Sequence, residues 1–97
     1  MITVAERGGA LVGFVTVDPK TRYLDQIVVA PEAWGSDVAQ ALMAEARRLS
    51  PGGLDLAVNA DNVRAIRFYE KQDFVVTGDD VNPISKAPIL KLSWRPG

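Results

Sequence analysis

The chain has 97 residues, a hydrophobic content of 47% and a formal net charge of −1 at pH 7, which predict one globular domain over residues 1–97 and disfavour a strongly basic nucleic-acid binder. It contains no Cys and no His, so disulfides, a thiol nucleophile, an imidazole base and the commonest metal ligands are excluded, and we expect no metal. No apolar run is long enough to span a bilayer and no signal peptide opens the sequence, so we expect a cytoplasmic protein.

The first third of the chain predicts three strands joined by tight turns. Ile2–Arg7 and Ala10–Val17 are rich in apolar, β-branched and aromatic residues, and the Gly8-Gly9 pair between them is a hairpin signal. A turn that contains Pro, Asp18–Thr21, leads to a third strand, Tyr23–Val29. We therefore expect a three-stranded antiparallel meander.

The stretch Leu24–Leu49 organises the chain, because it joins a buried strand to an amphipathic helix through a short turn. The helix is expected to open at Ser36 or Asp37 and to end at Leu49, before a Ser-Pro-Gly-Gly run. Its apolar face is formed by Val38, Leu42, Ala46 and Leu49. Backbone N–H groups and the helix dipole converge where such a helix starts, which makes the junction a ready site for an anion.

The second half of the chain alternates strands and helices. The predicted elements are a strand Leu54–Val58, a helix Val63–Gln72, a strand Phe74–Thr77, a polar loop Gly78–Pro88 and a strand Ile89–Trp94. Asp61 or Asn62 is placed to cap the second helix. Because a helix separates the third strand from the fourth, we expect these two strands to be parallel neighbours joined by a right-handed crossover. The order βββ-α-β-α-β-β predicts an α/β fold with a mixed sheet.

Two segments together resemble the GNAT superfamily of acetyl-CoA-dependent N-acyltransferases. Residues 27–43, IVVAPEAWGSDVAQALM, are similar to the V-x-P and R/Q-G-x-G-x-G/A signature of that family at a strand–helix junction. Residues 59–74, NADNVRAIRFYEKQDF, are similar to its N-x-x-A-x-x-F/L-Y-E-K-x-G-F helix and following strand. The resemblance implies a GNAT-like sheet with a parallel, splayed strand pair at the cofactor site. It also implies transfer of an acetyl group from acetyl-CoA to a primary amine of a small molecule or peptide.

The resemblance assigns roles to the residues that match. The residues implied to bind the cofactor are Ile27, Val28, Val29, Trp34, Gly35, Ser36, Asp37, Val38, Ala39, Asn62 and Tyr69. The strand end pairs with the pantetheine amides and holds the oxyanion, the helix start holds the pyrophosphate, and Asn62 contacts the pantetheine arm. Tyr69 protonates the leaving thiolate, and Asp25, on a strand that carries a bulge, is a candidate general base. The structural alternatives are a core tyrosine, a capping asparagine and an exposed strand carboxylate.

The sequence departs from the family at several positions. Trp34 replaces the usual Arg or Gln, and is either a lid over the cofactor or an anchor for a partner chain. Asp37 replaces the middle Gly, and a positive φ at this position would cost a non-glycine residue roughly 1–2 kcal/mol. Its negative charge would repel a pyrophosphate. Alternatively, Asp37 is a structural cap of the helix. Asp73 replaces the usual Gly before Phe74, which is expected to weaken the helix C-cap.

The chain also begins near the second strand of the family. We therefore expect the strand and two helices that form much of the acceptor wall to be absent or supplied by another subunit. An incomplete sheet leaves an exposed edge, which favours a homodimer. Two hypotheses follow: an acetyl-CoA-dependent N-acetyltransferase, or a non-catalytic GNAT-like module with weak or lost CoA binding that acts through dimerisation or partner contact. No feature supports a nucleic-acid or membrane role.

Overall fold

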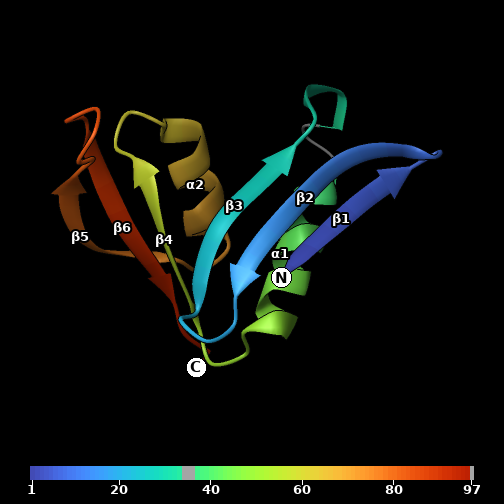
Figure 1. The fold of residues 1–97 in the computed structure, drawn as a ribbon, viewed down its shortest axis with the longest axis horizontal. Helices are drawn as coiled ribbons and strands as arrows, with labels where there is room; N and C mark the ends of the chain where they lie inside the picture. The colour runs from blue at the N-terminus through green and yellow to red at the C-terminus, as the bar shows by residue number, and fades with distance from the viewer. Residues whose placement is uncertain (34–36, 97) are drawn as a thin grey trace. The chain divides into compact units, whose positions relative to one another are not determined.

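The computed structural model describes residues 1–33 and 37–96 and confirms the predicted order of strands and helices (Figure 1). The strands are β1 (Ile2–Arg7), β2 (Ala10–Asp18), β3 (Tyr23–Val29), β4 (Leu54–Asn59), β5 (Val75–Val81) and β6 (Pro88–Trp94). The helices are η1 (Pro31–Ala33), α1 (Val38–Leu49) and α2 (Val63–Lys71). Within the described residues no helix is both long and apolar enough to cross a membrane. The chain divides into two compact units, Met1–Leu54 and Asp55–Gly97, and the single domain expected over residues 1–97 stays a prediction.

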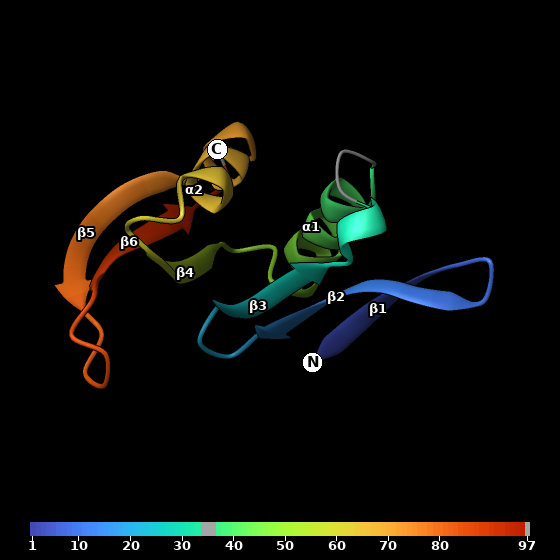
Figure 2. The same cartoon turned by 90° about the horizontal axis from the view of Figure 1, so that it is seen from above.

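The first unit is an antiparallel meander of β1, β2 and β3 with α1 against one face (Figures 1 and 2). Its core joins apolar side chains of the strands to the apolar face of the helix. The buried hydrophobic residues of the first unit are Val12, Val15, Val17, Leu24, Ala33, Val38, Leu42, Met43, Ala46 and Leu54. Buried and exposed residues alternate along β2, and buried residues recur every three to four positions along α1. These burial patterns match the apolar patterns from which the strand and the helix were predicted.

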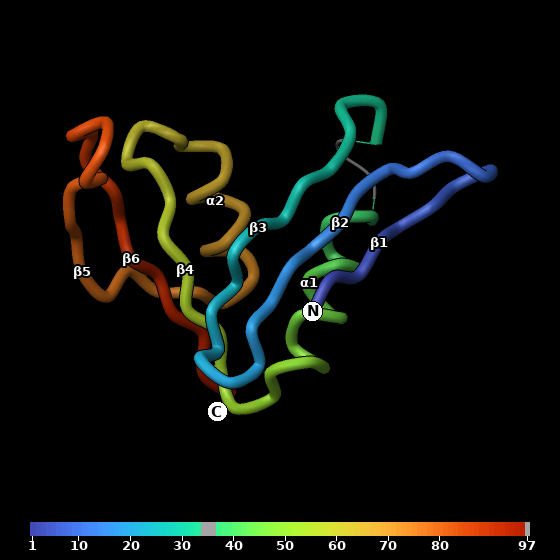
Figure 3. Tube along the Cα trace, in the orientation of Figure 1, coloured from blue at the N-terminus to red at the C-terminus, as the bar shows by residue number. Residues whose placement is uncertain are grey.

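The turn between β1 and β2 is formed as the sequence predicts. Gly8 and Gly9 have φ values of 60° and 82°, and two consecutive positive φ values are typical of a type I′ hairpin turn. Glycine has no Cβ to clash in this conformation, so the pair ends β1 and starts β2 without strain. In the tube of Figure 3 this turn is the blue tip farthest from α1.

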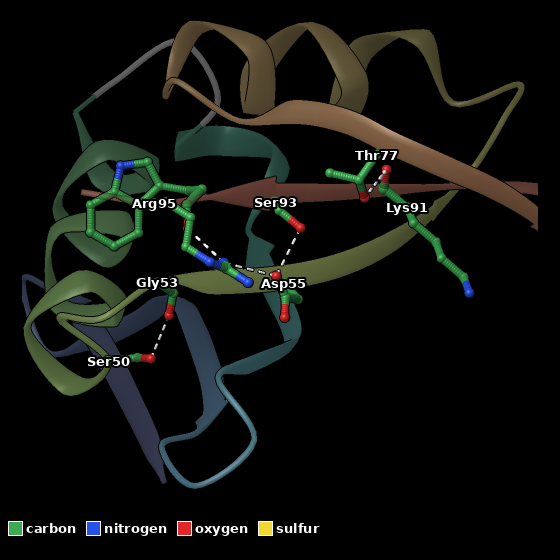
Figure 4. A network of polar contacts seen from close by, with 8 residues as sticks. Ser50, Gly53, Asp55, Thr77, Lys91, Ser93 and Arg95 are labelled. Atoms are coloured by element: carbon green, nitrogen blue, oxygen red, sulfur yellow. Dashed lines mark hydrogen bonds and ion pairs between the residues drawn. The ribbon is translucent and has the colours of Figure 1, made fainter. Parts of the chain in front are cut away.

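The second unit contains β4, β6 and β5, in that order across its sheet, together with α2. β5 and β6 are antiparallel, with Val76 opposite Leu92. The start of β4 contacts the end of β6, because Ser93 Oγ donates to Asp55 Oδ1 at 2.8 Å, and Arg95 Nη1 lies 2.9 Å from the same oxygen (Figure 4). The core is formed by Leu56, Tyr69, Phe74 and Leu92.

The polar loop predicted for Gly78–Pro88 is wrong over Gly78–Val81, because β5 continues to Val81, and at Pro88, where β6 begins. Thr77 is an extra residue in the β5–β6 ladder, and pairing resumes after it with Gly78 opposite Lys91. Its hydroxyl donates to the Lys91 carbonyl at 3.3 Å (Figure 4). Asp80 also lies 3.5 Å from Lys91, so the polar residues that indicated a loop form the solvent-facing side of an edge strand.

Candidate active site

The end of β3, which the motif assigns to the pantetheine amides, lies very close to β2 and α1. A Cβ placed on Gly13 of β2 would lie 2.7 Å from the Val28 carbonyl oxygen and 3.1 Å from Leu42 Cδ1. Gly13 is also the register partner of Val29. Ile27 and Val29 are half-buried and Val28 is exposed. The glycine therefore lets the strand end and the helix that follows it approach β2 more closely than any other residue allows.

The start of α1 is well defined from Asp37 onwards. Asp37 has a φ of −82°, so the strain expected from a positive φ is absent. Asp37 is the N-cap residue of α1, but its side chain makes no capping hydrogen bond. Its Oδ1 instead lies 3.3 Å from Arg7 Nη2 on β1. Both side chains are exposed, so the pair adds little stability, but it places a cation beside the carboxylate at the helix start. Trp34, Gly35 and Ser36 lie outside the described residues.

Asp25 occupies a bulge in β3. Thr16 of β2 pairs with Gln26 and the next β2 residue pairs with Leu24, so Asp25 is the extra residue between them. The amide of Gln26 hydrogen-bonds the Thr16 hydroxyl at 3.1 Å. Asp25 is exposed and lines an open hollow of about 560 Å³, together with Thr16 and Tyr23. A bulge changes the direction of a side chain, and here the bulged residue, Asp25, lines the open hollow.

Asn62 begins α2 as its N-cap. Its Oδ1 accepts a hydrogen bond from the Ala65 amide at 3.2 Å, so the cap is Asn62 rather than Asp61. Within the described residues the Nδ2 group of Asn62 has no acceptor, and the side chain is exposed. The capping bond fixes the amide while leaving its donor available, so capping and contact with a ligand carbonyl are compatible.

Tyr69 is held by the way α2 ends. The Phe74 amide donates to the Tyr69 carbonyl at 3.0 Å and the Asp73 amide donates to the Glu70 carbonyl at 3.1 Å, which is the Schellman pattern. Asp73 takes the left-handed conformation that this pattern requires, with a φ of 68°. The chain reversal packs the Phe74 ring with its centroid 5.6 Å from that of the Tyr69 ring, and the Phe68 ring lies at the same centroid distance. The tyrosine ring therefore packs against two aromatic neighbours.

The hydroxyl of Tyr69 is suited to donate a proton. Tyr69 is 8% exposed, and burial raises its pKa above the ordinary value of 10.0, because the phenolate loses solvation. The hydroxyl has no hydrogen-bond partner among the described residues. It therefore stays protonated at neutral pH, and no neighbour competes for its proton.

The candidate residues fall into two groups. Asp25, Ile27–Val29 and Asp37–Ala39 belong to the first unit, and Asn62 and Tyr69 belong to the second. Sequence reasoning missed two contributors in the first unit, Gly13 and Arg7. The signal for Gly13 was a lone glycine inside a strand pattern, whereas the pairing of Arg7 with Asp37 spans 30 residues and left no local signal. No group of three or more acidic side chains in the described part of the chain is placed to hold a metal ion.

A profile of the acetyltransferase (GNAT) family matches residues 1–74, which contain both motif segments. The chain belongs to the GNAT acetyltransferase family. The resemblance drawn from the two motifs is thereby confirmed. The mixed α/β class is confirmed as well, because solved acetyltransferase structures superpose on nearly the whole chain.

This GNAT chain is 34% identical over 85 residues to the peptidyl-lysine N-acetyltransferase YjaB of Salmonella typhimurium, a match that covers 86% of this chain and 57% of that protein. The solution structure of apo YjaB from Escherichia coli has a TM-score of 0.83 at 29% identity, covering 95% of this chain and 63% of that one. A putative streptothricin acetyltransferase from Bacillus anthracis, solved with acetyl coenzyme A, has a TM-score of 0.90 at 23% identity, covering 99% and 62%. The chain thus spans little more than half the length of the curated relatives it matches.

Proposed function

We propose that this GNAT chain transfers the acetyl group of acetyl-CoA to a primary amine, with a peptide lysine as the first acceptor to test. Its family membership and its likeness to proteins named peptidyl-lysine N-acetyltransferases support the reaction class. Acetyl-CoA would supply an activated thioester. The observation that carries the proposal is Tyr69, a buried tyrosine with a raised pKa whose hydroxyl has no hydrogen-bond partner among the described residues.

In the proposed reaction the amine nitrogen bonds to the thioester carbonyl carbon, and the carbon–sulfur bond breaks. The backbone N–H of Val29 stabilises the carbonyl oxygen, since the Val28 N–H points toward Phe14 of β2. The Tyr69 hydroxyl gives its proton to the leaving sulfur. Asp25 accepts the proton of the amine. Asp25 lies three residues before Val28, roughly 10 Å along the strand, so it acts through water rather than by direct contact. Two carboxylates, Asp18 and Asp25, line the hollow and attract a cationic amine to this side of the sheet.

The direct test is the turnover of Tyr69→Phe. Because the protein has no Cys, a thiol reagent measures released CoA without background from the protein. Removing a general acid lowers turnover by about 10²-fold or more, while the dissociation constant for acetyl-CoA changes little. Glu70→Gln, an exposed neighbour on α2, is the control and should keep full turnover. An equal loss of acetyl-CoA affinity and turnover in Tyr69→Phe would assign the ring to packing alone.

The non-catalytic module is favoured by one observation, the exposed carboxylate of Asp37 at the start of α1. A pyrophosphate bound there meets a negative charge that, among the described residues, Arg7 offsets. Calorimetric titration with acetyl-CoA separates the two functions, since absent binding in both the natural chain and Asp37→Asn supports the module. Binding that appears only in Asp37→Asn also supports it, and binding in both supports the enzyme.

We also infer that the protein is a homodimer in which an edge strand is covered. β5 lies at one edge of its sheet, and its Val75 and Val76 are 62% and 49% exposed. Light scattering on the purified chain tests this directly, and a monomer at 100 μM would refute it. The cytoplasmic location expected from the sequence stays a prediction.

A further inference from the structure

Arg7 brings a cation to the start of α1 from a distant part of the chain. Ala5 of β1 lies opposite Gly13, and a Cβ on Gly13 would point at Leu42 of α1, so Ala5 faces the helix. Arg7 is two residues further along the strand and therefore faces the same way. Its Nη2 lies 3.3 Å from Asp37 Oδ1, so the guanidinium reaches the N-cap of α1.

The segment that forms the start of α1 carries no cation of its own. Between Arg22 and Arg47 the sequence has no Lys or Arg, but it has the carboxylates Glu32 and Asp37 in the turn that leads into the helix. The other cationic groups of the first unit lie toward the opposite end of the strands or of α1: the Met1 ammonium on the Val17 carbonyl, Lys20 and Arg22 in the turn before β3, and Arg47 and Arg48 in the last turn of α1. An anion at the start of α1 therefore depends on Arg7 for a positive side chain.

The contact with Asp37 uses only a part of what the Arg7 guanidinium offers. Among the described residues Asp37 is the one partner of Arg7, and it accepts from a single nitrogen at 3.3 Å. The two side chains are 57% and 85% exposed, so solvent screens the pair and it is easily exchanged. A phosphate group presents paired oxygens that match the planar fork of an arginine, which makes it the stronger partner.

The first turn of α1 supplies the remaining donors of an anion site. The amides at the start of an α-helix have no intrahelical acceptor, and the helix dipole adds partial positive charge there. The helix is regular from its first turn, because the Ala41 amide donates to the Asp37 carbonyl at 2.9 Å, and the Asp37 carboxylate accepts no capping hydrogen bond. Amides together with a guanidinium are the donors that a diphosphate needs, so the residues present fit the pyrophosphate of acetyl-CoA.

We propose that Arg7 is a phosphate-binding residue of the cofactor site. Its guanidinium pairs with Asp37 when no cofactor is bound and donates to the pyrophosphate when acetyl-CoA binds at the start of α1. Asp37 therefore competes with the cofactor for one guanidinium and limits the affinity. This inference rests on the proposed function, because it concerns the cosubstrate of that reaction.

The test is calorimetric titration with CoA, which requires no acetyl transfer. Arg7→Gln should weaken CoA binding about tenfold at low salt, as expected for the loss of a charge-assisted hydrogen bond, and high salt should reduce the difference. Arg7→Lys should restore a part of the affinity, because it keeps the charge without the fork. Arg48→Gln is the matched control, since Arg48 is also exposed and pairs with Glu45 at the other end of α1, and it should change the affinity by less than about twofold.

Two further titrations separate direct phosphate contact from other roles of Arg7. If Arg7 only neutralised Asp37, the effect of Arg7→Gln would disappear in the Asp37→Asn background, whereas direct contact predicts about the same tenfold loss there. Dephospho-CoA keeps the pyrophosphate but lacks the 3′-phosphate of CoA. Its affinity should therefore fall by the same factor in Arg7→Gln.

Four results would overturn the role of Arg7. They are an unchanged CoA affinity in Arg7→Gln, an equal loss in Arg48→Gln, a loss that vanishes in the Asp37→Asn background, and a loss seen with CoA but not with dephospho-CoA. Circular dichroism of each variant establishes that the fold is retained, and the exposure of Arg7 makes unfolding an unexpected outcome.

Failure of this inference is distinguishable from failure of the proposed function. CoA binding that depends on Arg7, in a chain that transfers no acetyl group, supports the role of Arg7 and refutes the reaction. Turnover that depends on Tyr69, with CoA affinity unchanged in Arg7→Gln, does the reverse. Absent CoA binding in both the unsubstituted chain and Asp37→Asn overturns both.

Discussion

Replacing Gly13 by alanine should weaken both the fold and the candidate site. The added Cβ would lie 2.7 Å from the Val28 carbonyl oxygen, which is closer than real Cβ atoms approach a backbone atom. It would also lie 3.1 Å from Leu42 Cδ1. The leucine methyl is able to rotate away, but the Val28 carbonyl belongs to β3, so the strand itself must move. Because Val28 and Val29 form the proposed cofactor edge, the strain acts on the site directly.

The cost follows from overpacking. Forcing an extra carbon into a packed region costs typically 1–3 kcal/mol, and the stiffer unfolded chain of an alanine variant returns about 0.4–1 kcal/mol. The net loss is therefore about 1–2 kcal/mol, which for a domain of this size lowers the Tm by roughly 5–15 °C. A shift of β3 by a few tenths of an ångström also misplaces its N–H groups, so acetyl-CoA should bind several-fold more weakly.

The chain provides a matched control in Gly78 on β5. An added Cβ there would meet nothing within 4 Å, and Gly78 does not have a positive φ. Gly78→Ala should therefore leave stability unchanged or raise it slightly. Urea unfolding followed by circular dichroism gives the free energies, and calorimetric titration gives the acetyl-CoA affinities. If Gly13→Ala is as stable as Gly78→Ala and binds acetyl-CoA equally well, the close approach of β2, β3 and α1 does not constrain the site.

Three further predictions concern single side chains. Asp73→Gly should raise the free energy of unfolding by about 1 kcal/mol, because glycine takes the φ of 68° without strain. Urea unfolding measures this change, and a lower free energy of unfolding would mean that the Asp73 side chain itself stabilises the turn. Asp37→Asn should tighten acetyl-CoA binding several-fold at low salt, because a charge roughly 6 Å from a pyrophosphate costs about 0.7 kcal/mol per phosphate charge in water, and the gain should fade at 0.5 M salt in calorimetry. Because burial raises the pKa of Tyr69 above 10.0, the tyrosine loses its proton at lower pH in the unfolded chain than in the folded one, so the free energy of unfolding should fall as the pH rises above about 10. Urea unfolding at pH 9 and 11 measures this fall, which should be smaller in Tyr69→Phe.

The elements that the sequence predicted correctly are those fixed by local pattern. The turn at Gly8-Gly9 needs two residues with positive φ, and both have it. α1 ends at Leu49 as predicted, and Ser50, its C-cap, is buried and donates from Oγ to the Gly53 carbonyl at 2.5 Å (Figure 4). In each case the residues that decide the structure are neighbours in the sequence, so their pattern is visible without the fold.

The features that sequence reasoning missed depend on residues far apart in the chain. β5 continues through Gly78–Val81 because β6 pairs with it, and a polar stretch gives no sign of that partner. The role of Gly13 depends on Val28 and Leu42, and the position of Arg7 depends on a hairpin that returns beside α1. Secondary-structure propensity reflects the local preferences of a segment. These features depend instead on tertiary contacts with distant parts of the chain.

Asp73, at the glycine position of the second motif, and Tyr69 are structurally coupled. The left-handed residue at Asp73 turns the chain so that Phe74 packs on Tyr69, which means that the conformation at residue 73 fixes the proposed acid. A β-branched residue is strained in that conformation, so Asp73→Val should destabilise the protein by at least about 1–2 kcal/mol and also lower turnover per folded molecule. Asp73→Gly keeps the turn and should keep full turnover. If Asp73→Val loses stability but retains the turnover of the folded fraction, the end of α2 supports the fold and Tyr69 is positioned by other contacts.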